Sequence, residues 1–302
     1  MNYASYIDRY LLNIEHNEKK PGTIKQYRSD LQQFISWFDS STVEDLFHID
    51  TTQIASYAEY LKKKKFHDAT IKRHLYVIHG FLNFHHIQID QSIKHTETYR
   101  TSPLQTSDFI SIKEMNTLLQ SMQRPIQSSA RDTLIHRNMA IVQLIRYKGL
   151  RPKEISSINM HMVNLAQSIM EFEVDDQQII YQLSGKPIQY IREYYQSIDP
   201  QIRPKWKSDE PLFVSFNNRS KDYQYDYENN QPKRLSARSI QEMIKDEVQL
   251  AGLRKISAKH LRNSCILDHL LSGQRDEDIQ RYFHLTHPFS LRRYKQYLQR
   301  YN

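Results

Sequence analysis

The apolar residues of this chain recur at helical spacing almost throughout, and they switch to strict alternation in one segment, residues 169–183. There Met170, Phe172 and Val174 alternate with glutamates, a polar Asp-Asp pair follows, and Ile179-Ile180-Tyr181 resumes the apolar run. Alternation has the period of a strand, and two such runs around a polar turn predict a β-hairpin. The chain is therefore expected to be mostly α-helical with a small β-sheet.

The first hundred residues are expected to form four or five short helices. The first covers residues 3–14, and the second begins at Thr23, which caps it after the breaker Pro21-Gly22. A third helix holds an apolar stripe over residues 54–61 and ends in the run Lys62-Lys63-Lys64-Lys65. A fourth carries the stripe over residues 71–82, with Asp68 or Thr70 as its cap.

Residues 88–108 are polar, lack a period and include Ser102-Pro103, which makes them the best candidate for a linker. We therefore predict a helical domain over residues 1–88, a linker over 89–108 and a second domain over 109–302. In the second domain, a helix that includes Ile135 and Ile145 should end at Gly149. Residues 199–235, rich in proline and asparagine, should be mostly loop, and the remainder should be helical to the end.

Net charge favours a polyanionic partner. The chain carries +8, and residues 250–302 hold ten Lys and Arg against four acidic residues, so they contribute +6 of that total. The lysine run at residues 62–65 is open to two interpretations, a phosphate-contacting edge or a solvated helix end.

Several classes are disfavoured. No apolar run approaches the roughly 20 residues of a membrane helix, and the N-terminus lacks the pattern of a secretory signal. Cys265 is the one cysteine, so no internal disulfide exists and a reducing cytoplasm is the expected location. Its apolar neighbours indicate a core residue rather than a nucleophile paired with histidine. No histidine, cysteine and carboxylate set has metal-site spacing, so no metal is expected.

Three residues, in a fixed order, suggest the chemistry. Arg151 follows Gly149-Leu150, Arg262 lies in Lys259-His260-Leu261-Arg262, and Tyr294 lies close to the C-terminus. Two guanidinium groups can hold the non-bridging oxygens of one phosphodiester, because each forks onto phosphate bidentately. A tyrosine hydroxyl can then attack that phosphorus and hold the DNA covalently. Tyr297 and Tyr301 compete with Tyr294 for this role.

These motifs resemble the tyrosine recombinases, also called the phage integrase family. Residues 3–84 are similar to the family's N-terminal core-binding domain, with Thr23-Ile24-Lys25-Gln26-Tyr27-Arg28-Ser29-Asp30-Leu31 matching its Thr-x-x-x-Tyr-x-x-x-Leu helix. Residues 137–155 resemble the junction of the family's first catalytic arginine, and residues 257–264 its second arginine box. The ordered set over both domains makes the resemblance strong.

The resemblance implies a helical, SAM-like core-binding domain followed by an α+β catalytic domain. It implies that Arg151 and Arg262 bind the scissile phosphate and that Tyr294 forms a 3′-phosphotyrosine. Tyr294 is preferred over its competitors because its separation from Arg262 is similar to that in the family. No cofactor is implied, because the phosphotyrosine conserves the bond energy for religation.

Three positions depart from the family's pattern. Lys259 stands where the family has a histidine, with His260 beside it. The family's hairpin lysine is absent: Gln177 falls nearest to its position and Lys186 is the next lysine. The family has a histidine or tryptophan late in its catalytic domain, and this position aligns on Leu285 here. His284 and His287 flank Leu285. Either Lys259 or Lys186 replaces the missing general acid, or catalysis is impaired, because a neutral glutamine amide cannot protonate a leaving group.

The leading hypothesis is a site-specific recombinase that acts on double-stranded DNA as a homo-oligomer, a tetramer by analogy with the family. The alternative is a DNA-binding protein on a recombinase scaffold that has lost catalysis. Expected DNA contacts come from the lysine run and from basic residues near the active site: Lys62, Lys63, Lys64, Lys65, Arg254, Lys255, Arg292 and Arg293.

Overall fold

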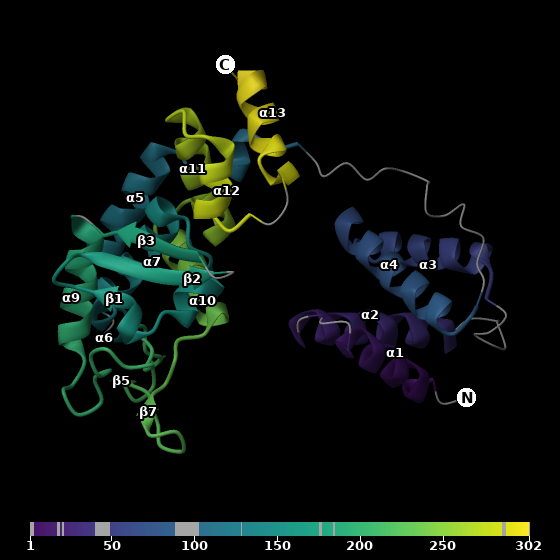
Figure 1. Cartoon of the computed structure of the whole chain (residues 1–302), viewed down its shortest axis with the longest axis horizontal. Helices are drawn as coiled ribbons and strands as arrows, with labels where there is room; N and C mark the ends of the chain where they lie inside the picture. Colours follow the sequence, from purple (N-terminus) through teal and green to yellow (C-terminus); the bar gives the residue numbers. More distant parts are fainter. Residues whose placement is uncertain are drawn as a thin grey trace. The chain divides into compact units, whose positions relative to one another are not determined.

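A computed structural model describes residues 3–16, 19, 21–39, 49–87, 103–127, 129–174, 177–183, 185–285 and 288–301. The chain divides into two compact units, residues 1–102 and 103–302, and each is considered by itself (Figure 1). The domain boundaries at residues 88 and 108 stay a prediction, because most of the predicted linker falls outside the described residues.

In its described part, the N-terminal unit consists of α1 (Ala4–His16), α2 (Pro21–Asp39), α3 (Thr51–Lys63) and α4 (Asp68–Phe84). The predicted apolar stripes meet in one core, where Leu31, Phe34, Tyr57, Leu61 and Ile78 are completely buried. Helices of this length are marginal alone, so this shared burial is what stabilises them. As predicted, α3 ends within the lysine run.

Two predicted helix starts are wrong, for local reasons. α2 begins at Pro21 rather than Thr23, because the fixed φ of proline suits the first helical turn, where its missing N–H has no partner to lose. α4 is capped by His67, whose Nδ1 accepts a backbone N–H at 3.3 Å. Asp68 and Thr70, the predicted caps, lie inside the helix.

The second unit is built around α7 (Ile135–Lys148), which contacts α5 (Ile112–Gln123), α9 (Lys186–Ser197) and α11 (Ala258–Leu271). Residues 137–146 of α7 are all buried, as expected for a central helix. The remaining helical elements are α6 (Ser129–Thr133), α8 (Pro152–Ser157), α10 (Ala237–Leu250), α12 (Asp276–Tyr282), α13 (Arg292–Tyr301) and the short turns η3 (Thr106–Asp108), η4 (Met160–Met162) and η5 (Pro288–Ser290).

The predicted β-hairpin is confirmed. An antiparallel sheet has the order β1 (Val163–Asn164), β2 (Ile169–Val174) and β3 (Gln177–Gln182). Its register pairs Met170 with Tyr181 and Phe172 with Ile179, and all four side chains are buried. The alternating residues therefore face the core, and the chain is mostly helical with small sheets, as predicted.

The segment over residues 199–235 was expected to be mostly loop, and it also contains four two-residue strands. β4 (Phe216–Asn217) pairs with β5 (Asp222–Tyr223), and β6 (Tyr225–Asp226) pairs with β7 (Gln231–Pro232). Strands this short are below the length at which alternation can be recognised in a sequence.

At one end of the second unit α11, α12 and α13 lie together (Figure 1). A small apolar cluster of Cys265, Ile279, Phe283 and Leu291 joins them, and Tyr294 packs against it. Burial raises the pKa of the Cys265 thiol to about 12, so the residue is an inert core thiol rather than a nucleophile.

Gly149 ends α7 with φ +64°, and a Cβ there would overlap the Phe283 ring. Gly149→Ala is therefore expected to destabilise the second unit by about 2–5 kcal/mol, from left-handed backbone strain and the clash together. Gly252, at φ +65° with nothing near its Cβ position, is the matched control, and Gly252→Ala should cost only about 1–2 kcal/mol. Urea unfolding would measure both, and equal losses would contradict the prediction.

Candidate active site and DNA interface

Arg151 stands directly before α8, at a junction where Gly149 ends one helix and Pro152 starts the next. Its backbone N–H donates to Glu154 Oε2 at 2.6 Å, and its Nη1 pairs with Glu154 Oε1 at 2.6 Å. Its Nη2 also donates to the carbonyl of His284 at 3.3 Å. The side chain is 42% exposed, so the guanidinium is oriented by these contacts and still reaches solvent.

Arg262 lies on α11 and is far more buried, with its side chain 11% exposed. Its guanidinium donates to the carbonyl of Gly149 and, at 2.6 Å, to the carbonyl of Phe283. It also pairs with Glu154 Oε2 at 3.6 Å, so one carboxylate lies between the two arginines. A guanidinium has five N–H groups, and these contacts leave hydrogens on both forks for a phosphate.

Tyr294 lies in the first turn of α13. Its hydroxyl donates to Asn263 Oδ1 at 2.8 Å, and Asn263 is the residue next to Arg262. Its ring lies edge-on to Phe109, with centroids 6.4 Å apart. Both Arg262 and the partner of the Tyr294 hydroxyl thus come from the N-terminal half of α11.

Burial and the neighbouring arginines shift the pKa of the Tyr294 phenol in opposite directions. Burial raises the pKa of the Tyr294 phenol above its usual range, while Arg262, Arg293 and, more weakly, Arg151 act to lower it. Burial also lowers the pKa of Arg262, with Arg151 adding to this and Glu154 opposing it. The two predicted arginines and the predicted tyrosine are therefore close enough to act on one another, and the resting phenol is protonated at neutral pH.

Lys259 is exposed on the first turn of α11, three residues before Arg262 and on the same face of the helix. His260, beside it, acts as a helix cap, because its Nδ1 accepts the backbone N–H of Ser257 at 3.0 Å at the start of α11. Burial lowers the pKa of His260, with nearby Arg254 adding to the effect. His260 is thus a neutral capping residue in this structure.

Gln177 and Lys186, the two candidates for the position of the family's hairpin lysine, lie at opposite ends of β3. Gln177 pairs with Val174 at the turn end of β2 and β3. Lys186 is the exposed first residue of α9, beyond the opposite end of β3. Five steps along the strand from Gln177 to Gln182 amount to about 17 Å, so Lys186 does not occupy the turn.

His284 lies beside the arginines, and His287 falls outside the described residues. The Nε2 of His284 is 3.2 Å from the hydroxyl of Tyr181, which donates to the carbonyl of Tyr282 at 3.0 Å. Because that hydroxyl has a single hydrogen, it accepts from His284 Nε2–H. His284 adopts φ +49°, which allows its carbonyl to face Arg151.

The lysine run borders a groove of the N-terminal unit. Lys62 and Lys63 line this groove together with Lys72, Tyr27 and Trp37. Other contacts hold the run at the helix end: Lys62 pairs with Glu59 at 2.8 Å, and the Lys64 ammonium lies 5.7 Å from the centre of the Tyr60 ring. Lys65 is exposed just beyond the C-terminal cap of α3.

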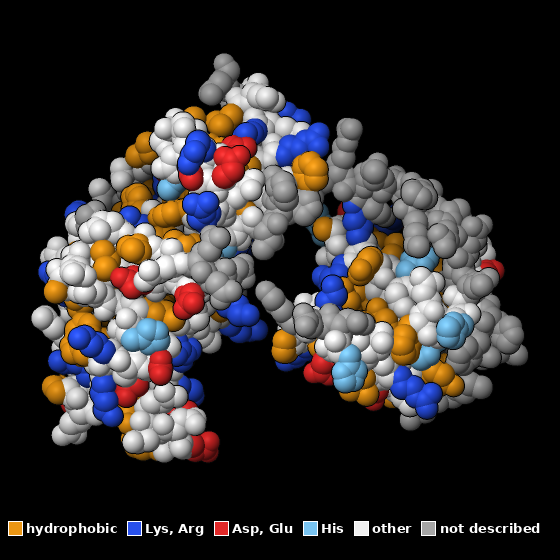
Figure 2. Space-filling model, viewed as in Figure 1, with side chains coloured by type: hydrophobic (Ala, Val, Ile, Leu, Met, Phe, Trp, Pro, Cys, Tyr) orange, Lys and Arg blue, Asp and Glu red, His pale blue; other side chains and the backbone are white. Residues whose placement is uncertain are grey.

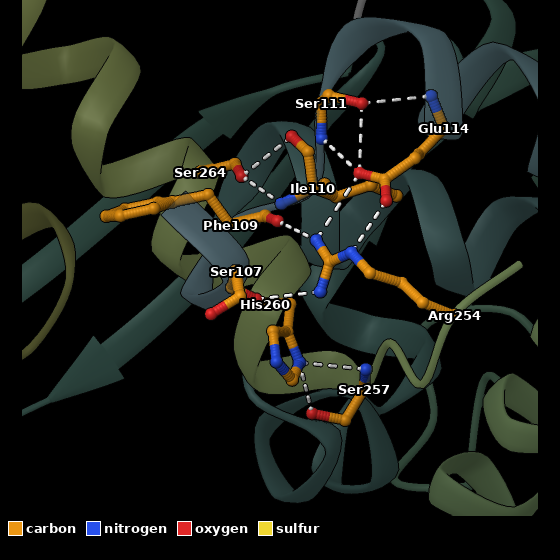
Figure 3. A network of polar contacts seen from close by, with 9 residues as sticks. All are labelled: Ser107, Phe109, Ile110, Ser111, Glu114, Arg254, Ser257, His260 and Ser264. Atoms are coloured by element: carbon orange, nitrogen blue, oxygen red, sulfur yellow. Dashed lines mark hydrogen bonds and ion pairs between the residues drawn. The ribbon is translucent and has the colours of Figure 1, made fainter. Parts of the chain in front are cut away.

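Among the basic residues predicted near the active site, Arg254 has a structural role. Its Nε pairs with Glu114 Oε1 at 2.7 Å, and its Nη atoms donate to the carbonyls of Ser107 and Phe109 (Figure 3). Lys255 and Arg292 are exposed, and Arg293 is half-buried beside Tyr294. On the face drawn in Figure 2, Lys and Arg side chains lie among other residues, with acidic ones close to some of them.

Sequence reasoning assigned no role to Glu154, Tyr181 or Asn263. Glu154 had a signal, because Pro152 and a glutamate three residues after Arg151 are typical of a helix start. Tyr181 and Asn263 had none, since their contacts are with residues 101 and 31 positions away.

Metal ligands and membrane spans are both absent from the described residues. No group of three or more His, Cys, Asp or Glu side chains there could hold a metal ion. No helix of that part of the chain is both long and apolar enough to cross a membrane.

Comparisons with known proteins agree with this architecture. A tyrosine recombinase XerD of Staphylococcus saprophyticus is 22% identical over 272 residues, which cover 89% of this chain and 86% of that protein. The XerH site-specific recombinase bound to palindromic difH substrate, in a post-cleavage complex, has a TM-score of 0.68 at 16% identity and covers 91% of this chain and 76% of that one. A lambda integrase(75-356) dimer bound to a COC′ core site has a TM-score of 0.64 at 13% identity, with coverage of 96% and 94%. These structures share the fold.

Family models match both units. The phage integrase N-terminal SAM-like domain matches residues 7–87, and the phage integrase family matches residues 108–299. Together they cover most of the chain, including the positions of both arginines and Tyr294. The chain belongs to the phage integrase family, the tyrosine recombinases, which cleave and rejoin DNA.

Proposed function

We propose that this chain is a site-specific recombinase in which Arg151 and Arg262 bind the scissile phosphate of double-stranded DNA and Tyr294 is the nucleophile. The observation that supports it most is the cluster itself. Both arginines pair with Glu154, and both act on the pKa of the Tyr294 phenol. The protein would act in the cytoplasm, with residues 1–88 and 109–302 as its two DNA-contacting domains.

In the proposed step, one phosphorus–oxygen bond of the DNA backbone is exchanged for a bond from phosphorus to Tyr294. The Tyr294 oxygen loses its proton and bonds to phosphorus, while the bond from phosphorus to the 5′ oxygen breaks. The departing 5′ oxygen takes up a proton and leaves a 3′-phosphotyrosine. Rejoining reverses each event, so no outside energy source enters the balance.

Exchange between two duplexes requires four strand cleavages, and each subunit supplies one Tyr294. We therefore propose a homotetramer on two DNA sites. Contacts of the subunits with the DNA backbone are assigned to Lys62, Lys63, Lys64, Lys65, Lys255, Arg292 and Arg293; Arg254 leaves this set because its guanidinium is held by Glu114 and two carbonyls.

Covalent capture tests the proposal and also finds the target. The full chain is incubated with a pool of duplexes of randomised sequence, each nicked so that a cleaved end diffuses away and cannot be rejoined. We expect a protein–DNA complex that survives SDS and that protease treatment destroys. Sequencing the DNA held in this complex gives the recognised half-site. DNA binding without any covalent complex would support the scaffold alternative, an impaired recombinase.

Lys259 is our candidate for the proton donor to the 5′ oxygen, because it lies on the same face of α11 as Arg262. We expect Lys259→Ala to slow single-turnover cleavage of the captured half-site by about 10²-fold or more, the usual effect of losing a general acid. Gln177→Ala should have a much smaller effect, because an amide supplies no proton.

A substrate with sulfur in place of the 5′ bridging oxygen separates these roles, since a thiolate departs without a proton. The sulfur substrate should restore most of the rate of Lys259→Ala. A larger defect in Gln177→Ala, or no recovery with sulfur, would remove Lys259 from this role.

A further inference from the structure

The hydroxyl of Tyr294 has a buried partner that the chemistry above does not use. It donates to Asn263 Oδ1 at 2.8 Å, and Asn263 is 4% exposed. On its other side, Asn263 Nδ2 donates to the carbonyl of Asp108 at 3.0 Å. One side-chain amide therefore bridges the reacting hydroxyl and the backbone of residues 105–110 at the start of the second unit, called the leading segment here.

The amide has only one orientation that satisfies both neighbours. A backbone carbonyl is solely an acceptor, so the NH₂ group must face Asp108 and the oxygen must face Tyr294. The phenol must then donate its proton. An amide oxygen held this way stabilises the neutral phenol and offers no hydrogen to a phenolate, so it opposes ionisation.

The leading segment, residues 105–110, is firmly held, which keeps the amide from turning. Ser264 Oγ accepts from the N–H of Ile110 at 2.9 Å and donates to its carbonyl at 3.1 Å (Figure 3). Arg254 binds the carbonyl of Phe109 while pairing with Glu114, and the centre of the Phe109 ring lies 4.5 Å from that of Tyr297. The leading segment thus contacts both α11 and α13.

We propose that Asn263 is a positioning residue that holds Tyr294 as a neutral phenol in the resting enzyme. This inference rests on the proposed role of Tyr294 as nucleophile. Attack on DNA then requires the hydroxyl to leave the Asn263 oxygen.

Four charged groups act on the ionisation of the Tyr294 phenol and must stay unchanged in any test of Asn263. Arg262 on α11, Arg293 on α13 and Arg151 before α8 favour the phenolate, whereas Asp108 of the leading segment disfavours it. None of them is altered in the variants below, so a change in the pH dependence of cleavage reports on residue 263.

The test compares Asn263→Leu and Asn263→Asp in single-turnover cleavage of the captured half-site between about pH 6.5 and 9.5. Leucine removes the acceptor, so the phenol should ionise about one pH unit earlier and cleavage at neutral pH should be about tenfold faster than in the wild type. Aspartate places an anion beside the phenol, so cleavage should be slower at neutral pH and should recover as the pH rises.

Ser264→Ala is the matched control. It also loosens the leading segment from α11, but Ser264 contacts Ile110 rather than Tyr294, so the pH dependence should stay that of the wild type. A leucine variant slower than the wild type at every pH would overturn the proposal. If it does not fold, an aspartate variant with an unchanged pH dependence overturns it equally. A wild-type enzyme that forms no covalent complex would instead contradict the proposed function.

Discussion

Tyr294→Phe should form no covalent complex with a nicked half-site, while binding the same DNA as tightly as the wild type. The substitution removes one oxygen and keeps the ring that packs against Phe109 and the cluster around Leu291. Without that oxygen no phosphorus–oxygen bond can form, so the loss should be complete to the limit of detection. Denaturing gels measure the complex, and a gel shift measures binding.

Tyr297→Phe is the control on the same helix. Its ring lies tilted against Phe109 and its hydroxyl lies 3.4 Å from Thr106 Oγ1, so loss of the hydroxyl should disturb α13 without removing the proposed nucleophile. Cleavage by Tyr297→Phe should remain within a few-fold of the wild-type rate. A covalent complex that persists in Tyr294→Phe and disappears in Tyr297→Phe would exchange the roles of the two tyrosines.

Arg262→Ala should lower the single-turnover cleavage rate by at least about 10³-fold, with a small loss of DNA affinity. Removing one donor that stabilises a developing negative charge commonly costs about 10²–10³-fold, and this one is buried and also braces the carbonyls of Gly149 and Phe283. Affinity should change little because this phosphate is one contact among many, so the salt dependence should fall by only about one unit of slope.

One further variant distinguishes the guanidinium fork from its charge, and a second is a surface control. Arg262→Lys keeps the positive charge and loses the planar fork, so it should remain strongly impaired. Arg238→Ala removes an exposed arginine that pairs with Glu242 on α10, and it should cleave normally. Wild-type cleavage by Arg262→Ala would show that the phosphate binds elsewhere.

Local pattern was enough to predict most of the fold. The alternation at residues 169–183 correctly predicted the hairpin, and Gly149 correctly marked the end of α7. The start of α2 was missed because Pro21-Gly22 was interpreted as a helix breaker, although proline suits the first helical turn. The start of α4 was missed because histidine caps helices less commonly than threonine or aspartate. The strands between Phe216 and Pro232 were missed because two residues carry no period.

The candidate site could be proposed from the sequence only where residue order was informative. The sequence alone singles out Arg151, Arg262 and Tyr294, and the structure places them close together. The pairing of Glu154 with Arg262 and the bridge made by Asn263 come from packing between distant segments, which no spacing reveals. The same is true of Arg254, which belongs to a basic stretch in the sequence and to a hydrogen-bond network between distant segments in the fold.

Glu154 sets the net charge of the cluster formed with Arg151 and Arg262. With the carboxylate between them, the two guanidinium groups present one net positive charge, which a singly charged phosphodiester would neutralise if it binds there as proposed. The pentavalent species of the proposed step would carry additional negative charge, and its attraction to the same groups would appear only at that point. Electrostatic stabilisation would thereby be directed towards the transition state rather than towards tighter retention of uncleaved DNA.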